Sequence, residues 1–261
     1  MDDKLQTAAP AGALVTQEAF DDMISDAGRG TENIGVNDVR PPRLMLCQSG
    51  SPQRKPDNPK QIAGLNELDL FNSLSNEIYG RDITFAVIAS LGSHWVEFDA
   101  ELKVVDPNVP EGDPRTEWTE NEAHERVKPV ATKFYDYLVW LIEHNEPVAF
   151  SLKSTQIKNA IKLNGLLKLP LKLEGKIIAN PPAWARTYKV ETKMESDKGY
   201  SWGGYNLSTV GVTPRETRLL LSELAKTYSK QNVVIEREDE APEVVEGTAG
   251  NTGGTADPTD M

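Results

Sequence analysis

Cysteine is almost absent from this 261-residue sequence. Cys47 is the only one, so no internal disulfide can form, which fits a reducing compartment. No apolar run approaches the roughly 18 residues that a membrane-spanning helix needs. The first residues, MDDKLQTAAPAG, lack the apolar segment of a secretion signal. These absences predict a protein of the cytoplasm that does not associate with a membrane.

Signals for catalysis are also scarce. His94, His124 and His144 have no spacing typical of metal ligands, and no glycine-rich phosphate loop stands between a strand and a helix. We therefore expect no enzyme activity, metal or cofactor. One alternative stays open, a metal-dependent nuclease, in which Asp82 would join Glu97, Asp99, Glu101 and Lys103 on neighbouring strands.

Positive charge is rare overall but concentrated in one part of the chain. The formal net charge is −12, yet residues 151–230 carry 14 basic and 6 acidic side chains. Residues 231–261 carry 1 basic and 8 acidic side chains, and residues 1–40 carry 3 and 8. A fold does not require this asymmetry, but attraction to an anion would use it.

Composition also predicts the division of the chain into domains. Residues 1–38 are acidic and rich in small side chains, typical of a mobile arm, and residues 39–231 hold the strand and helix signals. Residues 104–126 read as an acidic insertion within that domain. Residues 232–261 lack aromatic side chains and periodicity, which predicts a disordered acidic tail.

The order of the predicted elements indicates the fold class. A hairpin of residues 83–90 and 94–99 is followed by strands at 133–143 and 148–154, a helix capped by Ser154 or Thr155, a second hairpin of 184–195 and 200–211, and a helix over 213–230. The last helix begins with a predicted capping box of Thr213 and Glu216. This order predicts a mainly β (α+β) protein with an OB-fold-like antiparallel barrel, an inserted helix and a C-terminal helix.

Lysines and aromatic side chains in the basic part predict a nucleic-acid surface. Lysines spaced along a helix can follow a phosphate backbone, and aromatic rings on an open sheet can stack on unpaired bases. Some of the rings, Trp184 above all, suit a core position equally well. The predicted DNA-binding residues are Lys153, Lys158, Lys162, Lys168, Lys172, Trp184, Arg186, Tyr188, Tyr200, Trp202 and Tyr205.

The acidic tail has two predicted roles. A flexible acidic segment can compete with DNA for a basic surface and can dock on replication or recombination proteins once displaced. The candidate docking residues are Glu236, Glu238, Asp239 and Glu240.

Four segments carry a resemblance to a known group of proteins: PPRLMLCQSGSP, NSLSNEIYGRDITFAVI, HWVEF and VAFSLKSTQIKNA. Over residues 40–210 the sequence resembles phage proteins encoded near replication or recombination genes, some of which are assigned as single-stranded DNA-binding proteins. The chain also resembles single-strand binders with an OB-fold core and an acidic tail, but its last residues, DPTDM, lack the acidic run closed by an aromatic. The resemblance implies a sequence-independent single-stranded DNA-binding protein of phage replication or recombination, in the bacterial host cytoplasm. The alternative is a virion or assembly protein.

Overall fold

The computed structural model describes residues 29–33, 41–101, 103–173, 175–197, 199–228 and 235. The chain divides into two units, Met1–Val39 and Arg40–Met261. Every helix and strand of the described residues lies in the second unit. The predicted domain boundaries near residues 38 and 231 fall on residues outside the described ranges, so they stay predictions.

One long strand, β4 (Asp82–Phe98), organises the main sheet. Its first half pairs with β12 (Arg186–Asp197), its last residues pair with β5 (Val104–Val109), and β8 (Thr132–Leu141) runs along most of its other side. The predicted hairpin of residues 83–90 and 94–99 is therefore wrong. The Leu-Gly-Ser stretch makes a bulge instead of a turn, with Gly92 at a φ of +93°.

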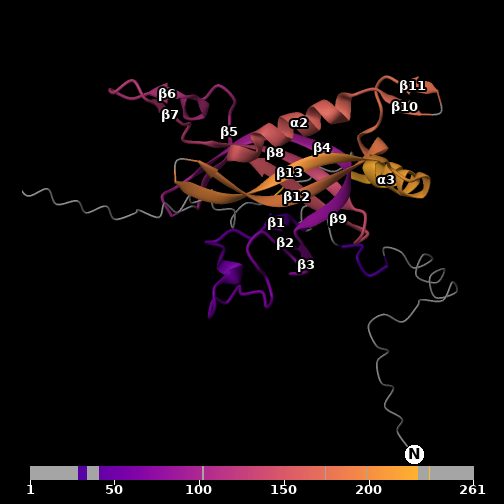
Figure 1. Ribbon diagram of the computed structural model, residues 1–261, viewed down its shortest axis with the longest axis horizontal. Coiled ribbons are helices and arrows are strands. Elements are labelled where there is room, and N and C mark those ends of the chain that lie inside the picture. Colours follow the sequence, from indigo (N-terminus) through magenta and orange to yellow (C-terminus); the bar gives the residue numbers. More distant parts are fainter. Residues whose placement is uncertain are drawn as a thin grey trace, which may run out of the picture. The chain divides into compact units, whose positions relative to one another are not determined.

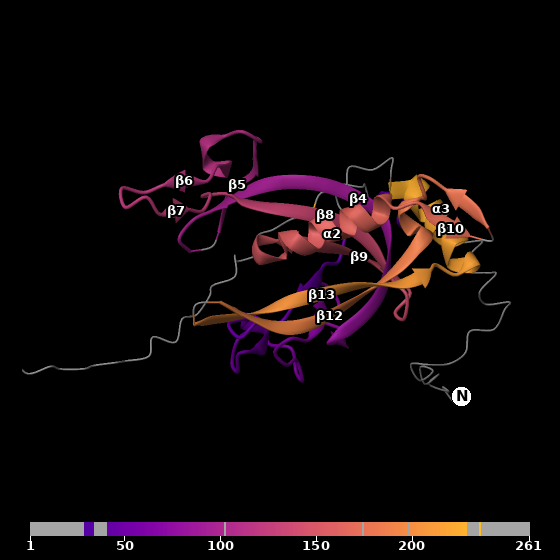
Figure 2. The same cartoon turned by 45° about the horizontal axis from the view of Figure 1, so that its top comes forward.

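The main sheet is antiparallel, in the order β13-β12-β4-β8-β9. β9 (Glu146–Lys153) and β13 (Tyr200–Val212) form its two edges, and no pairing of the described strands joins them, so the sheet is not a closed barrel. The helix α2 (Ile157–Lys168) lies between the two edge strands and packs against β8, β9 and β13 (Figure 2). The predicted strands at 133–143 and 148–154 and the predicted second hairpin are confirmed as β8, β9 and β12–β13.

The main core fills the space between the sheet and α2. Aromatic side chains dominate it: Phe85 packs against Phe150 and Tyr188, and Tyr205 packs against Phe150. The hydroxyl of Tyr137 donates to the side-chain oxygen of Asn164 at 2.8 Å, which ties β8 to α2. This core buries Tyr188, Val190, Tyr205 and Leu207 on the inner face of β12–β13, and the opposite face is the outer face of that hairpin.

A second core covers the other side of β4 and β8. Leu221 of α3 (Arg215–Tyr228) packs on Ala86, Ile88, Leu138 and Trp140. The predicted capping box at the start of α3 is not formed, because the buried hydroxyl of Thr213 has no hydrogen-bond partner among the described residues. No helix of the described residues is long and apolar enough to cross a membrane.

Smaller elements surround the main sheet (Figure 1). The strands β1 (Leu44–Leu46), β2 (Leu70–Asn72) and β3 (Ile78–Gly80) form a three-stranded antiparallel sheet. Two short hairpins are β6 (Thr119–Glu120) with β7 (Arg126–Val127), and β10 (Leu171–Leu173) with β11 (Lys176–Ile178). Single 3-10 turns are η2 (Pro52–Arg54), η3 (Pro114–Thr116), η4 (Ser154–Gln156) and η5 (Ala183–Ala185).

Candidate nucleic-acid interface

The register of the β12–β13 hairpin sets which side chains share its outer face. Glu195 lies opposite Trp202, Lys193 lies opposite Gly204, and Asp197 lies opposite Tyr200. Because side chains alternate along a strand, this face is distinct from the one that packs in the core. The outer face therefore carries two aromatic rings beside a lysine and two acids.

A cluster of polar side chains forms around the Glu195 carboxylate. Lys158 of α2 and Lys193 of β12 approach one carboxylate oxygen at 2.9 and 3.1 Å. The indole N–H of Trp202 and the amide of Gln156 donate to the other oxygen at 3.2 and 3.3 Å. The Glu195 side chain is only 9 % exposed, whereas that of Lys158 is 60 % exposed. We call these five residues the Glu195 cluster.

Charge and burial act in opposite directions on Glu195. Burial raises the pKa of its carboxyl group, but the hydrogen bonds and charges of Lys158 and Lys193 together outweigh burial and lower the pKa below the ordinary 4.5. The pairing therefore stabilises the fold above pH 4.5, and this contribution is lost as the pH falls through the lowered native pKa. At neutral pH the cluster holds two cations and one anion.

Gly204 makes room for this cluster. A Cβ atom at position 204 would lie 2.7 Å from the Gln156 amide nitrogen and 2.7 Å from the Glu195 carboxyl carbon. Polar side chains thus pack directly on the strand backbone at this position.

Gly204→Ala is therefore expected to displace Glu195 and Gln156 and to lower the free energy of unfolding by about 1–3 kcal/mol. Chemical denaturation measures the change. Gly165→Ala in α2 is the matched control, because a Cβ there meets nothing within 4 Å; it should leave stability unchanged or raise it by up to about 1 kcal/mol. Equal effects of the two substitutions would contradict the close approach at Gly204.

The outer edge of β13 is also occupied by side chains. Gln48 accepts from the backbone N–H of Gly203 at 2.7 Å and donates to its carbonyl at 3.0 Å. Gln156 accepts from the N–H of Tyr205 at 3.1 Å, and Asn159 donates to the Tyr205 carbonyl at 2.9 Å. These amides replace the missing neighbouring strand.

Lys162 completes this series of edge contacts. Its ammonium group donates to the carbonyl of Leu207 at 2.6 Å, so this predicted DNA-binding lysine holds α2 against β13. The same contact leaves Lys162 less free to meet a phosphate than Lys158. The helix and the edge strand thus form one continuous polar seam beside the Glu195 cluster.

The other predicted lysines lie in different surroundings. The ammonium of Lys153 lies 5.4 Å from the centre of the Phe134 ring. Lys168 and Lys172 are exposed at the far end of α2 and on β10, and neither forms an ion pair within the described residues. Of the predicted lysines, only Lys158 belongs to the Glu195 cluster.

The structure corrects the predicted set of stacking rings. Tyr188 and Tyr205 are buried in the main core, so neither ring is available to a base. Trp184 precedes β12 in η5 and packs against the second core under α3. Arg186 donates to the carbonyls of Leu166, Leu169 and Pro170, and thereby satisfies the C-terminal end of α2.

Tyr200 and Trp202 are the predicted rings that remain accessible on the outer face; the Tyr200 side chain is 44 % exposed. Gln156, Lys193 and Glu195 were not among the predicted site residues. The predicted turn between the two strands could have indicated Glu195, since the hairpin register places it opposite Trp202.

The residues of the nuclease alternative do not converge. Asp82 and Glu97 are near opposite ends of β4, roughly 50 Å apart along an extended strand. Asp82 pairs with Lys189, and Glu101 pairs with Lys103. Within the described ranges, no group of three or more His, Cys, Asp or Glu side chains could hold a metal ion.

The predicted docking residues of the tail, Glu236, Glu238, Asp239 and Glu240, lie outside the described residues. Their role stays a prediction.

A search of curated proteins and a search of solved structures found nothing similar. The model of the family described as Pam3 phage gp34-like protein matches residues 10–234, which include all the helices and strands described above. The phage origin implied by the sequence resemblance is thus supported, and the chain belongs to the Pam3 phage gp34-like protein family.

Proposed function

We propose that this chain binds single-stranded DNA on the outer face of β12–β13 and α2, without sequence preference and without catalysis. The observation that carries the proposal is the arrangement of the Glu195 cluster. Two accessible rings, Tyr200 and Trp202, stand beside two lysines that one buried carboxylate holds in place. Rings that can stack, next to cations that can meet phosphates, are what unpaired DNA requires.

The role of Glu195 in this proposal is to hold the other groups in position. A long lysine side chain loses conformational entropy when it binds, and a lysine already paired has lost part of it. The side chains of Lys158 and Lys193 are 60 % and 48 % exposed, so they can meet a phosphate while Glu195 holds them. The hydrogen bond to Trp202 fixes the tilt of the indole ring in the same way.

The rest of the basic part extends this surface. Lys168 is the last residue of α2 and Lys172 lies in β10, so both are at the end of α2 that is away from Lys158 of the Glu195 cluster. A DNA strand that crosses the outer face could follow α2 toward them. An OB-type arrangement is also part of the proposal, since a curved antiparallel sheet with a helix between its edge strands is compatible with it. We further propose a role in phage DNA replication or recombination in the host cytoplasm.

A binding assay with single-stranded and duplex DNA of equal length tests the proposal. Single-stranded DNA should bind more tightly, because stacking needs unpaired bases. Affinity should fall with salt, and Lys158→Ala with Lys193→Ala should reduce the slope of log K against log salt by about 0.7 per lost phosphate contact. Lys55→Gln, at an exposed position directly after η2, is the control and should leave this slope unchanged. Equal affinity for both forms of DNA would contradict the proposal and favour a virion or assembly protein.

A further inference from the structure

Two hairpins protrude from the described part of the chain. One carries Lys168 and Lys172, toward which the proposed DNA surface extends, and the other plays no part in that surface. The acidic arm, residues 104–130, includes β5, η3, β6 and β7, and the basic hairpin, residues 168–178, includes β10 and β11. The acidic arm and the basic hairpin lie at opposite ends of the second unit in both Figures 1 and 2. Their chemistry is complementary.

The acidic arm combines negative charge with exposed apolar side chains. Residues 104–130 carry seven acidic and three basic side chains. Trp118 is 54 % exposed, and the guanidinium of Arg126 lies 4.2 Å from the centre of its ring. Val105, Val127 and Val130 are exposed as well. Tryptophan and arginine are enriched among the residues that contribute most to binding at protein interfaces.

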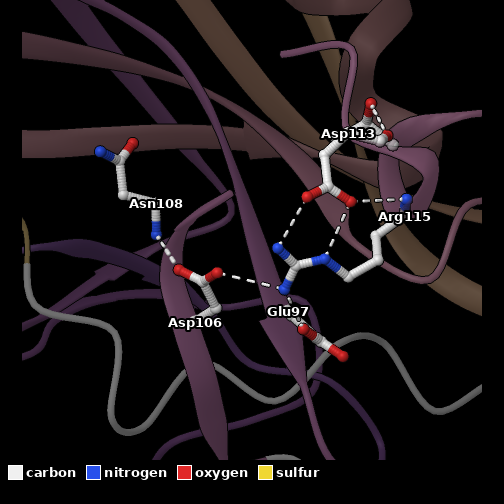
Figure 3. A network of polar contacts seen from close by, with 6 residues as sticks. Glu97, Asp106, Asn108, Asp113 and Arg115 are labelled. Carbon is white, nitrogen blue, oxygen red and sulfur yellow. Dashed lines mark hydrogen bonds and ion pairs between the residues drawn. The ribbon is translucent and has the colours of Figure 1, made fainter. Parts of the chain in front are cut away.

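An ion-pair network fixes the base of the acidic arm. Arg115 binds Asp113 at 2.9 Å, Glu97 at 2.6 Å and Asp106 at 3.1 Å (Figure 3). Hydrogen bonds from the side chain and backbone of Arg115 lower the pKa of Asp113 to about 2. The network joins the arm to β4 and β5, so the arm keeps a defined shape before it meets a partner.

The basic hairpin has the opposite character. Lys168, Lys172 and Lys176 form no ion pair with any described residue. Ile177 lies opposite Lys172 in the hairpin and is 71 % exposed. Leu169 is exposed beside them. Exposed lysines around an isoleucine are the counterpart of acids around a tryptophan.

We infer that the acidic arm of one copy docks on the basic hairpin of a second copy. The opposite charges attract the two surfaces, and their apolar side chains supply the buried centre. Contact between two basic hairpins or between two acidic arms would bring like charges together. Because the two surfaces are different and lie at opposite ends, the contact is heterologous and can be repeated to form an open chain of copies.

Sedimentation velocity of the full-length protein without DNA tests the inference. The weight-average mass should rise with protein concentration at low salt, with a dissociation constant on the order of 10 µM, as for a small interface. High salt should restore the monomer, because it screens the charges. Failure of this test leaves the proposed DNA binding untouched, since no nucleic acid is present in it.

Two variants, each with one disabled surface, make the test specific. Lys172→Gln/Lys176→Gln/Ile177→Ser disables the basic hairpin, and Trp118→Ser/Glu120→Gln/Glu122→Gln disables the acidic arm. Each variant alone should be a monomer, because its one intact surface has no counterpart. An equimolar mixture should give dimers and nothing larger.

Lys55→Gln/Lys60→Gln, which removes two exposed cations elsewhere, should associate like the unchanged protein. Circular dichroism of each variant checks that it remains folded. If a triple variant does not fold, the double variant that keeps Trp118 or Ile177 replaces it in the test. An unchanged protein that stays monomeric at low salt, or a mixture that stays monomeric, would overturn the inference. Variants that associate like the unchanged protein would overturn it too.

Discussion

Replacement of both Tyr200 and Trp202 by alanine is expected to weaken binding of single-stranded DNA by at least about 30-fold, since each stacked base contributes about 1–3 kcal/mol. The slope of log K against log salt should hardly change, because the lysines of the Glu195 cluster remain. Fluorescence anisotropy with a labelled oligonucleotide at several salt concentrations measures both quantities.

Two controls separate stacking from other effects of this change. Tyr200→Phe with Trp202→Phe keeps a ring at each position and removes the hydrogen bond from Trp202 to Glu195, so it should retain most of the affinity. Trp118→Ala removes an exposed ring from the acidic arm and should leave DNA affinity unchanged. Loss of affinity in the Trp118 variant, or none in the double alanine variant, would place the stacking site elsewhere.

Gln156→Leu is expected to lower the free energy of unfolding by about 2–5 kcal/mol. The leucine has a similar size but leaves the N–H of Tyr205 and one N–H of the Asn159 amide without their acceptor, in a buried position. Chemical denaturation measures this loss, and DNA affinity should fall with it because Glu195 also loses a donor.

The matched control for this change is Gln61→Leu, at an exposed position, which should alter stability by no more than about 0.5 kcal/mol. A loss below about 1 kcal/mol in Gln156→Leu would mean that the polar seam does not hold α2 on β13. Contacts other than those of Gln156 would then have to hold the outer-face side chains in position.

Much of the fold could be predicted from the sequence, because local patterns determine it. Apolar and aromatic residues give β8 and β9 a buried strand pattern, and the turn before Tyr200 gives β12–β13 as a hairpin. The single strand β4 could not be predicted this way. A glycine between two apolar runs is typical of a turn as well as a bulge, and only the pairing with β8 decides between them.

The candidate site was only partly predictable for a similar reason. Tyr188 and Trp202 look alike in the sequence, each an aromatic residue in an alternating strand, but the main core buries Tyr188, whereas Trp202 lies on the other face and donates to Glu195. Which face is covered depends on long-range packing. Lys158 and Lys162 are one turn apart on the same helix, yet one meets Glu195 and the other meets a backbone carbonyl of the edge strand.

Photo-crosslinking tests the central claim most directly. A single-stranded oligonucleotide that carries 5-iododeoxyuridine links to aromatic side chains stacked on the modified base, and mass spectrometry of the digested protein identifies them. We predict crosslinks at Tyr200 and Trp202 of β13, lost when duplex DNA of the same sequence replaces the single strand. Crosslinks at Trp118 instead, or equal crosslinking of duplex DNA, would contradict binding of unpaired bases on the outer face of β12–β13.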